Sequence, residues 1–113
     1  MKNIFFDKEE LVYILDGLSE KMTMYYCSNN WNIRTEKHKN VGLLMEKIKN
    51  NEPKIEKISF DKKELDFILG GLYSQQQSYG GGYFPHEDKV MYKHFKNVRS
   101  IIEKVEVEQK KGE

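Results

Sequence analysis

Apolar residues recur at helical spacing in four stretches of this chain. Within each stretch they stand three and four positions apart, which gathers them on one face of an α-helix. The four stripes are Leu11, Ile14, Leu15, Leu18, Met22 and Tyr25; Val41, Leu44, Met45 and Ile48; Leu65, Ile68, Leu69 and Leu72; and Val98, Ile101, Ile102 and Val105. The pattern predicts helices over residues 7–27, 35–50, 61–78 and 86–108.

The first and third stretches are copies of one another. Residues 4–18 and 58–72 are identical at ten of fifteen positions, at a constant offset of 54. The segment KNVGLLMEKI, which starts at Lys39, matches KNVRSIIEKV from Lys96 at an offset of 57. Self-similarity at this period is typical of a duplicated supersecondary unit, here a helical hairpin.

The repeat sets the expected domain organisation. Neither hairpin could bury enough apolar surface alone, so the two must share one core. We expect an all-α fold in which tandem hairpins, 4–51 and 58–108, form a pseudo-twofold four-helix domain. The single domain spans 1–113, with 109–113 as a frayed, charged tail.

Each copy opens its first helix with the same signal. Asp7 is followed three residues later by Glu10, and Asp61 is followed by Glu64. This is the spacing of a capping box, in which the aspartate carboxylate accepts from the free backbone N–H groups of the first turn. We therefore expect helices to begin just after both aspartates.

Two more features recur at matched positions. Ile4 and Phe6, and their copies Ile58 and Phe60, stand two positions apart, as residues on one face of a short strand do, which predicts a two-stranded contact or, alternatively, plain extended linkers. Gly17 and Gly71 stand inside the leading helices, where glycine costs about 1 kcal/mol relative to alanine. We infer a close crossing of these helices; the alternative is a tolerated glycine inherited by both copies.

Composition narrows the functional classes. Nineteen basic and eighteen acidic residues leave a formal charge of +1, whereas nucleic-acid or anionic-membrane surfaces usually show a basic excess. A single cysteine, Cys27, excludes an internal disulfide. Neither a membrane-spanning helix nor a signal peptide is expected. The 17 lysines against two arginines suggest an AT-rich genome, so we expect a cytoplasmic protein of a low-GC bacterium or its phage.

Candidate catalytic and metal-ligating residues form no known pattern. The acidic pairs at 9–10 and 87–88 fall in first helical turns, where the cap and the helix dipole account for them. The three histidines lack the H-x-x-x-H and H-E-x-x-H spacings, and the glycine-rich loop lacks the G-K-[ST] of a phosphate cradle. We predict no catalytic residue, no metal, no cofactor and no enzymatic activity.

Two stretches lack Asp, Glu, Lys and Arg altogether, residues 22–33 and 67–86, and each contains a predicted hairpin end. Both are rich in aromatic and neutral hydrogen-bonding side chains, as interface centres are. The predicted partner-binding residues are Tyr26, Asn29, Asn30, Trp31, Gln76, Tyr79, Tyr83 and Phe84. The alternative is that several aromatic residues, Tyr25 and Phe67 above all, belong to the core.

Two functions fit these features. The first is a non-enzymatic protein–protein interaction module, such as an inhibitor or regulatory protein, that binds another protein or a second copy through both hairpin ends in one contact region. The second is a small-molecule-binding protein whose Trp31, Tyr79, Tyr83 and Phe84 line a cleft for a planar or nucleotide-like ligand. Nucleic acid is a weaker candidate partner, because acidic residues interleave with the lysines of the return helices.

Overall fold

Four helices make up most of the described chain, which comprises residues 2–51, 58–79 and 89–111 of a computed structural model. The elements in chain order are β1 (Lys2–Ile4), α1 (Lys8–Tyr26), the π-helical turn η1 (Ile33–Lys37), α2 (His38–Asn51), β2 (Ile58–Phe60), α3 (Lys62–Ser78) and α4 (Lys89–Lys110). The all-helical prediction is confirmed, with a minimal two-stranded sheet beside the helices.

Both capping boxes are present. The backbone N–H of Glu10 donates to Asp7 Oδ1 at 2.8 Å, and Asp7 N–H donates to Glu10 Oε1 at 3.0 Å. In α3 the same pair of bonds joins Asp61 and Glu64, at 2.8 and 2.9 Å. Two short sequence motifs therefore determine where α1 and α3 begin.

One helix end differs from the prediction. α4 continues to Lys110, so residues 109 and 110 are helical instead of belonging to a frayed tail. Gln109 Nε2 donates to Asp66 Oδ1 on α3 at 3.0 Å, which ties this last turn to the second hairpin. The expected start of α4 at residue 86 lies outside the described residues.

The segments before α1 and α3 pair with each other. β1 and β2 form an antiparallel ladder in which Ile4 lies opposite Ile58, its equivalent in the repeat. The ring of Phe6, which follows β1, and that of Phe60, the last residue of β2, have centroids 6.0 Å apart. The two-stranded contact is therefore formed, and Ile4 and Ile58 are the matched residues that face each other in it.

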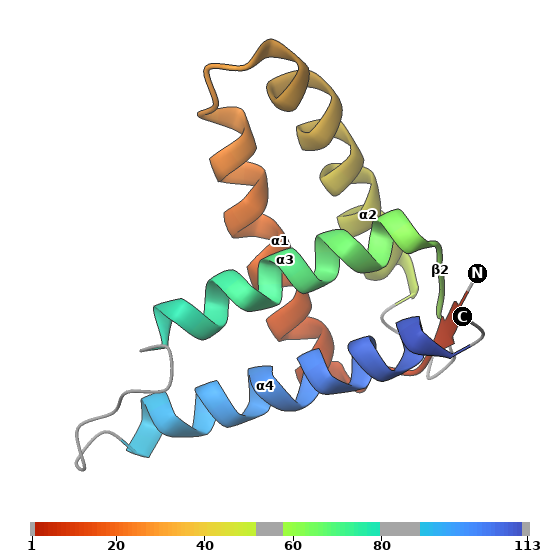
Figure 1. Cartoon of the computed structure of the whole chain (residues 1–113), viewed down its shortest axis with the longest axis vertical. Helices are drawn as coiled ribbons and strands as arrows, with labels where there is room; N and C mark the ends of the chain where they lie inside the picture. The colour runs from red at the N-terminus through yellow and green to blue at the C-terminus, as the bar shows by residue number, and fades with distance from the viewer. Residues whose placement is uncertain (1, 52–57, 80–88, 112–113) are drawn as a thin grey trace.

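The leading helices cross at their glycines, and Figure 1 shows α3 running across α1. A Cβ atom on Gly17 would lie 2.7 Å from the carbonyl carbon of Gly71, and one on Gly71 would lie 2.7 Å from the carbonyl carbon of Gly17. Such distances leave no room for a side chain. The predicted close crossing is confirmed, and it brings backbone against backbone.

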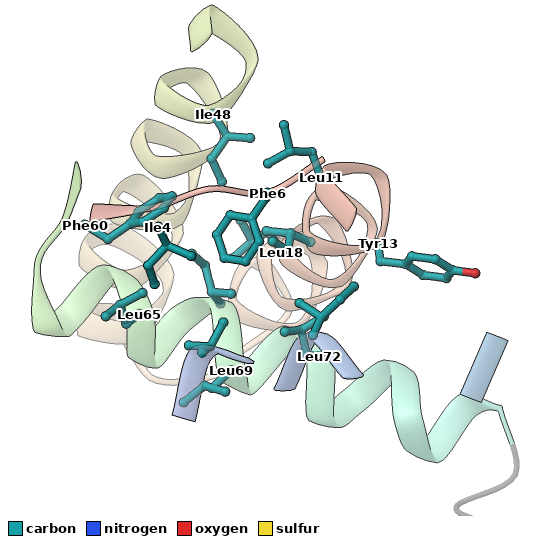
Figure 2. Close-up of a cluster of buried hydrophobic side chains, with 14 of the residues drawn as sticks. Ile4, Phe6, Leu11, Tyr13, Leu18, Ile48, Phe60, Leu65, Leu69 and Leu72 are labelled. Atoms are coloured by element: carbon teal, nitrogen blue, oxygen red, sulfur yellow. The ribbon is translucent and has the colours of Figure 1, made fainter. Parts of the chain in front are cut away.

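One hydrophobic core spans both hairpins. Figure 2 shows Ile4, Phe6 and Phe60 from the strand segments converging with leucines of α1 and α3. Apolar side chains of α2 and α4 complete this core, among them Ile48 and Val105, neither of which is exposed to solvent. Neither hairpin thus has a core of its own.

Two ion pairs join the first hairpin to the second. Lys47 Nζ on α2 lies 2.9 Å from Glu64 Oε1 on α3, and Lys104 Nζ on α4 lies 3.1 Å from Glu10 Oε1 on α1. The two lysines occupy equivalent positions in the repeat, and so do the two glutamates. Each lysine therefore binds the glutamate of the other hairpin.

Candidate functional site

Hydrogen bonds between side chains and the backbone order the loop between α1 and α2. Ser28 Oγ accepts a hydrogen bond from the backbone N–H of Asn30 at 3.1 Å. Asn30 Oδ1 in turn accepts from the N–H groups of Asn32 and Ile33, at 3.0 and 3.4 Å. Asn30 was predicted to bind a partner, but its side chain already caps the next helical segment.

That helical segment contains a π turn. The N–H of His38 donates to the carbonyl of Ile33, five residues earlier, so residues 33–37 form a wider turn before α2. Turns of this kind are rare and occur frequently at functional sites. Here the turn carries Arg34, Glu36 and Lys37, the first charged groups after the uncharged stretch.

Exposed aromatic residues surround Arg34. Trp31 is 69% exposed and Tyr26 is 60% exposed, which is unusual for such large rings. The Arg34 guanidinium carbon lies 5.6 Å from the Tyr26 ring centroid and 5.8 Å from that of Trp31. The His38 ring lies 5.7 Å from the Tyr26 ring on its α2 side. We call Tyr26, Trp31, Arg34 and His38 the tip cluster.

A second cation–π contact lies beside the tip cluster, where Lys37 Nζ is 5.8 Å from the Tyr25 ring centroid. Tyr25 itself packs edge-on against Phe67, with centroids 6.3 Å apart. Burial raises the pKa of the Tyr25 phenol above its ordinary value. Tyr25 and Phe67 thus pack against the core, which was the alternative considered for these two residues.

The other predicted binding residues lie on the second hairpin. Tyr79 stacks on the His94 ring of α4, with centroids 5.1 Å apart and planes inclined by 22°. Burial raises the pKa of Tyr79, and the nearby Tyr13, Asp16 and Glu20 act in the same direction. Tyr79 is therefore half-buried against α4. Gln76 is also half-buried.

Two predicted residues, Tyr83 and Phe84, lie outside the described residues, whereas Asn29 is exposed in the loop of the first hairpin. One shared contact region therefore stays a prediction, because the end of the second hairpin lies outside the described residues. In Figure 1 the end of the first hairpin and the C-terminal end of α3 point in different directions. The physical reason is the crossing at Gly17 and Gly71, which makes the helices diverge beyond it.

A polar cluster that the sequence did not reveal lies between α1 and α4. The Tyr13 hydroxyl is 2.6 Å from His94 Nδ1 and accepts from Asn97 Nδ2 at 3.2 Å. Tyr13 is a buried residue of the core, and Figure 2 shows its hydroxyl pointing away from the other labelled side chains. A cavity of about 180 Å³ adjoins it, lined in part by Asn97, Ser100 and Glu9. One signal was available: Tyr13 replaces the Phe67 of the other copy.

Metal binding has no support in the described parts of the chain. No group of three or more His, Cys, Asp or Glu side chains there could hold an ion. Cys27 is exposed at the end of α1. Among the same residues, no helix combines the length and apolar character that crossing a bilayer requires.

Comparisons with protein families, curated proteins and solved structures give no match to this chain. The functional argument therefore depends on the site itself. Its main features are two exposed aromatic rings and a guanidinium whose central carbon lies within 6 Å of both ring centroids. Among the described residues, the tip cluster holds the largest exposed aromatic side chain.

Proposed function

We propose that this protein is a non-enzymatic protein–protein interaction module that binds its partner through the tip cluster. The observation that carries this proposal is the exposure of Trp31 and Tyr26 on either side of one arginine. Trp, Tyr and Arg are the residue types that supply most of the binding energy at protein interfaces. The partner is another protein or a second copy of this chain, and an inhibitory or regulatory role fits such a module.

The tip cluster is also partly ordered before any partner binds. The Arg34 guanidinium contacts both rings, and the Asn30 cap fixes the start of the segment that carries Arg34. Side chains already held in place lose less conformational entropy on association. A preformed aromatic surface is therefore suited to specific binding.

Folding does not account for the position of Trp31. It is absent from the hydrophobic core and from the partly buried residues that pack against it. Placing an indole in water forgoes the favourable free energy that burial would provide. Binding to a partner would recover this free energy, and the single exposed Cys27 agrees with action in the reducing cytoplasm.

The test compares three immobilised proteins: the unaltered chain, Trp31→Ala, and Val107→Ala as a control. Val107 lies on α4 and is 55% exposed, so its truncation also removes an exposed apolar side chain. We expect Trp31→Ala to weaken partner binding by about 2 kcal/mol or more. The free energy of unfolding should change by less than about 0.5 kcal/mol in both variants.

Binding is measured by mass spectrometry of proteins retained from a lysate of the native cell. A protein retained by the unaltered chain and by Val107→Ala, but lost with Trp31→Ala, is the expected result. Equal retention by all three would contradict the proposal. Sedimentation of the purified chain tests separately whether the partner is a second copy.

The small-molecule alternative gains no support from the geometry. It needs Trp31 and Tyr79 in one cleft, but the end of the first hairpin, which carries Trp31, and the C-terminal end of α3, which precedes Tyr79, point in different directions (Figure 1). Tyr79 is engaged with His94 instead. The interaction module therefore remains the one function that we propose.

A further inference from the structure

We infer that the tip cluster recognises an acidic segment of its partner, a stretch of polypeptide whose carboxylates meet Arg34 and Lys37. This inference rests on the proposed function and specifies the partner's chemistry. Its starting point is the local charge. Between residues 20 and 40 four cationic side chains, Lys21, Arg34, Lys37 and Lys39, stand against Glu20 and Glu36 alone.

This cationic surplus is concentrated at the tip. The whole chain carries a formal charge of only +1, so most cations elsewhere are balanced by acidic residues. Lys47 and Lys104 illustrate the contrast, because each has a glutamate within 3.1 Å. Within the described ranges, no carboxylate lies within ion-pair distance of Arg34 or Lys37. Their charges remain available to a partner.

Arg34 has the geometry for carboxylate binding. A guanidinium is a planar fork whose N–H groups bind a carboxylate through two parallel hydrogen bonds. The rings of Tyr26 and Trp31 lie next to the Arg34 guanidinium. A ring face is a weaker hydrogen-bond acceptor than a carboxylate, so the rings do not compete with a carboxylate for the N–H groups. Arg34 is exposed, so a carboxylate can reach it from solvent.

An acidic polypeptide fits this surface better than a nucleic acid does. Phosphate backbones are bound along a track of many cations. Here the cations within η1 and the start of α2 are Arg34, Lys37 and Lys39, with Glu36 among them. So few charges match a short acidic segment, and the rings can contact its aliphatic or aromatic side chains.

Trp31 provides a direct readout, because it is the one tryptophan of the chain and lies at the site. Its fluorescence is titrated with poly-L-glutamate, poly-L-lysine and single-stranded oligothymidylate. We expect saturable binding of poly-L-glutamate that weakens with added salt, and no binding of the other two probes. Arg34→Gln should reduce the affinity for poly-L-glutamate about tenfold, because it removes the charged partner of the carboxylate hydrogen bonds.

The matched control is Lys96→Gln. Lys96 is an exposed cation whose Nζ lies 5.4 Å from the Tyr92 ring on α4, so this change also removes a charge stacked on an aromatic ring. It should leave the affinity unchanged. Arg34→Lys retains the charge without the planar fork and should bind with intermediate affinity. Circular dichroism verifies that each variant is folded.

Three outcomes would overturn the inference: binding of oligothymidylate without poly-L-glutamate, binding of none of the probes, or equal affinity in Arg34→Gln and the unaltered chain. The proposed function can survive such a result. If a partner is still retained from lysate in a Trp31-dependent manner, the tip binds protein without selecting acidic segments. If Trp31-dependent retention also fails, both proposals fall.

Discussion

At the scale of single residues, two glycines determine how the hairpins meet. Gly17 and Gly71 touch through backbone atoms, and each would place a Cβ atom within 3 Å of the other's carbonyl group. Backbone cannot move aside as a flexible side chain can, so any larger residue must separate α1 from α3. Glycine has a low helix propensity, but its lack of a side chain allows the backbones of α1 and α3 to touch at these positions.

We predict opposite effects of alanine at two helical glycines. Gly17→Ala should lower the free energy of unfolding by about 1 to 3 kcal/mol, because the added methyl group overpacks the crossing. Gly42→Ala should raise it by about 0.4 to 1 kcal/mol, because alanine restricts the unfolded chain and its Cβ would meet only Met22 Cε at 3.6 Å. Urea denaturation of both variants measures the difference, and a stabilised Gly17→Ala would refute the close crossing.

Ionisation of tyrosine side chains should make the stability of the folded state depend on pH in the alkaline range. Burial raises the pKa of Tyr25 and Tyr79, while the hydrogen bond to Glu106, followed by burial, raises the pKa of Tyr73. Because the folded chain favours the neutral phenols, their contribution to stability is complete below about pH 10 and is lost as the pH rises through the folded pKa values.

The measurement is the urea midpoint as a function of pH, with phenolate absorbance recorded in parallel. We expect the midpoint to fall above about pH 10. Tyr79→Phe removes one of these groups and should reduce the steepness of that fall. A midpoint that rises with pH in this range would show that the sign is wrong.

At the scale of elements, local motifs and remote packing contribute differently. The starts of α1 and α3 could be predicted because a capping box involves only residues three positions apart, as at Asp7 and Glu10. The π turn at Ile33–Lys37 could not, because it depends on how the loop enters α2 and has no sequence signature of its own. Arg34 and His38 were missed as site residues for the same reason.

Substitutions at Asp61 test how much the N-terminal cap of α3 contributes to stability. Asp61→Ala removes the acceptor of the 2.8 Å bond from Glu64 N–H and should lower the free energy of unfolding by about 1 kcal/mol. Asp61→Asn retains a capping oxygen and should cost much less. Thermal denaturation monitored at the helix signal compares them, and equal losses would mean that charge, not the cap, matters at this position.

At the scale of the whole molecule, the sequence predicted where the two hairpins contact each other better than it predicted the directions in which their helices run. Gly17 with Gly71, and residues 4–6 with 58–60, indicated where the two hairpins meet, because both features recur at the same offset. The different directions of α1 and α3 follow from how whole helix surfaces pack, which no short motif encodes. Tyr79 was therefore assigned to a shared surface, whereas it packs on His94.

The ion pairs that cross between the hairpins have a consequence for assembly. Lys47 with Glu64, and Lys104 with Glu10, join groups that a twofold homodimer of hairpins would also join. A covalent connection between two such halves raises their effective concentration relative to separate chains.

Cutting the chain within that link should turn folding into a bimolecular reaction. We expect separate 1–54 and 55–113 peptides to lack cooperative melting, and their mixture to regain helicity with a melting temperature that rises with peptide concentration. The intact chain should melt independently of concentration. A peptide that melts cooperatively alone at every dilution would contradict this expectation. With that result, the stability of the intact chain would correspond to the affinity of its two halves for each other at a fixed effective concentration.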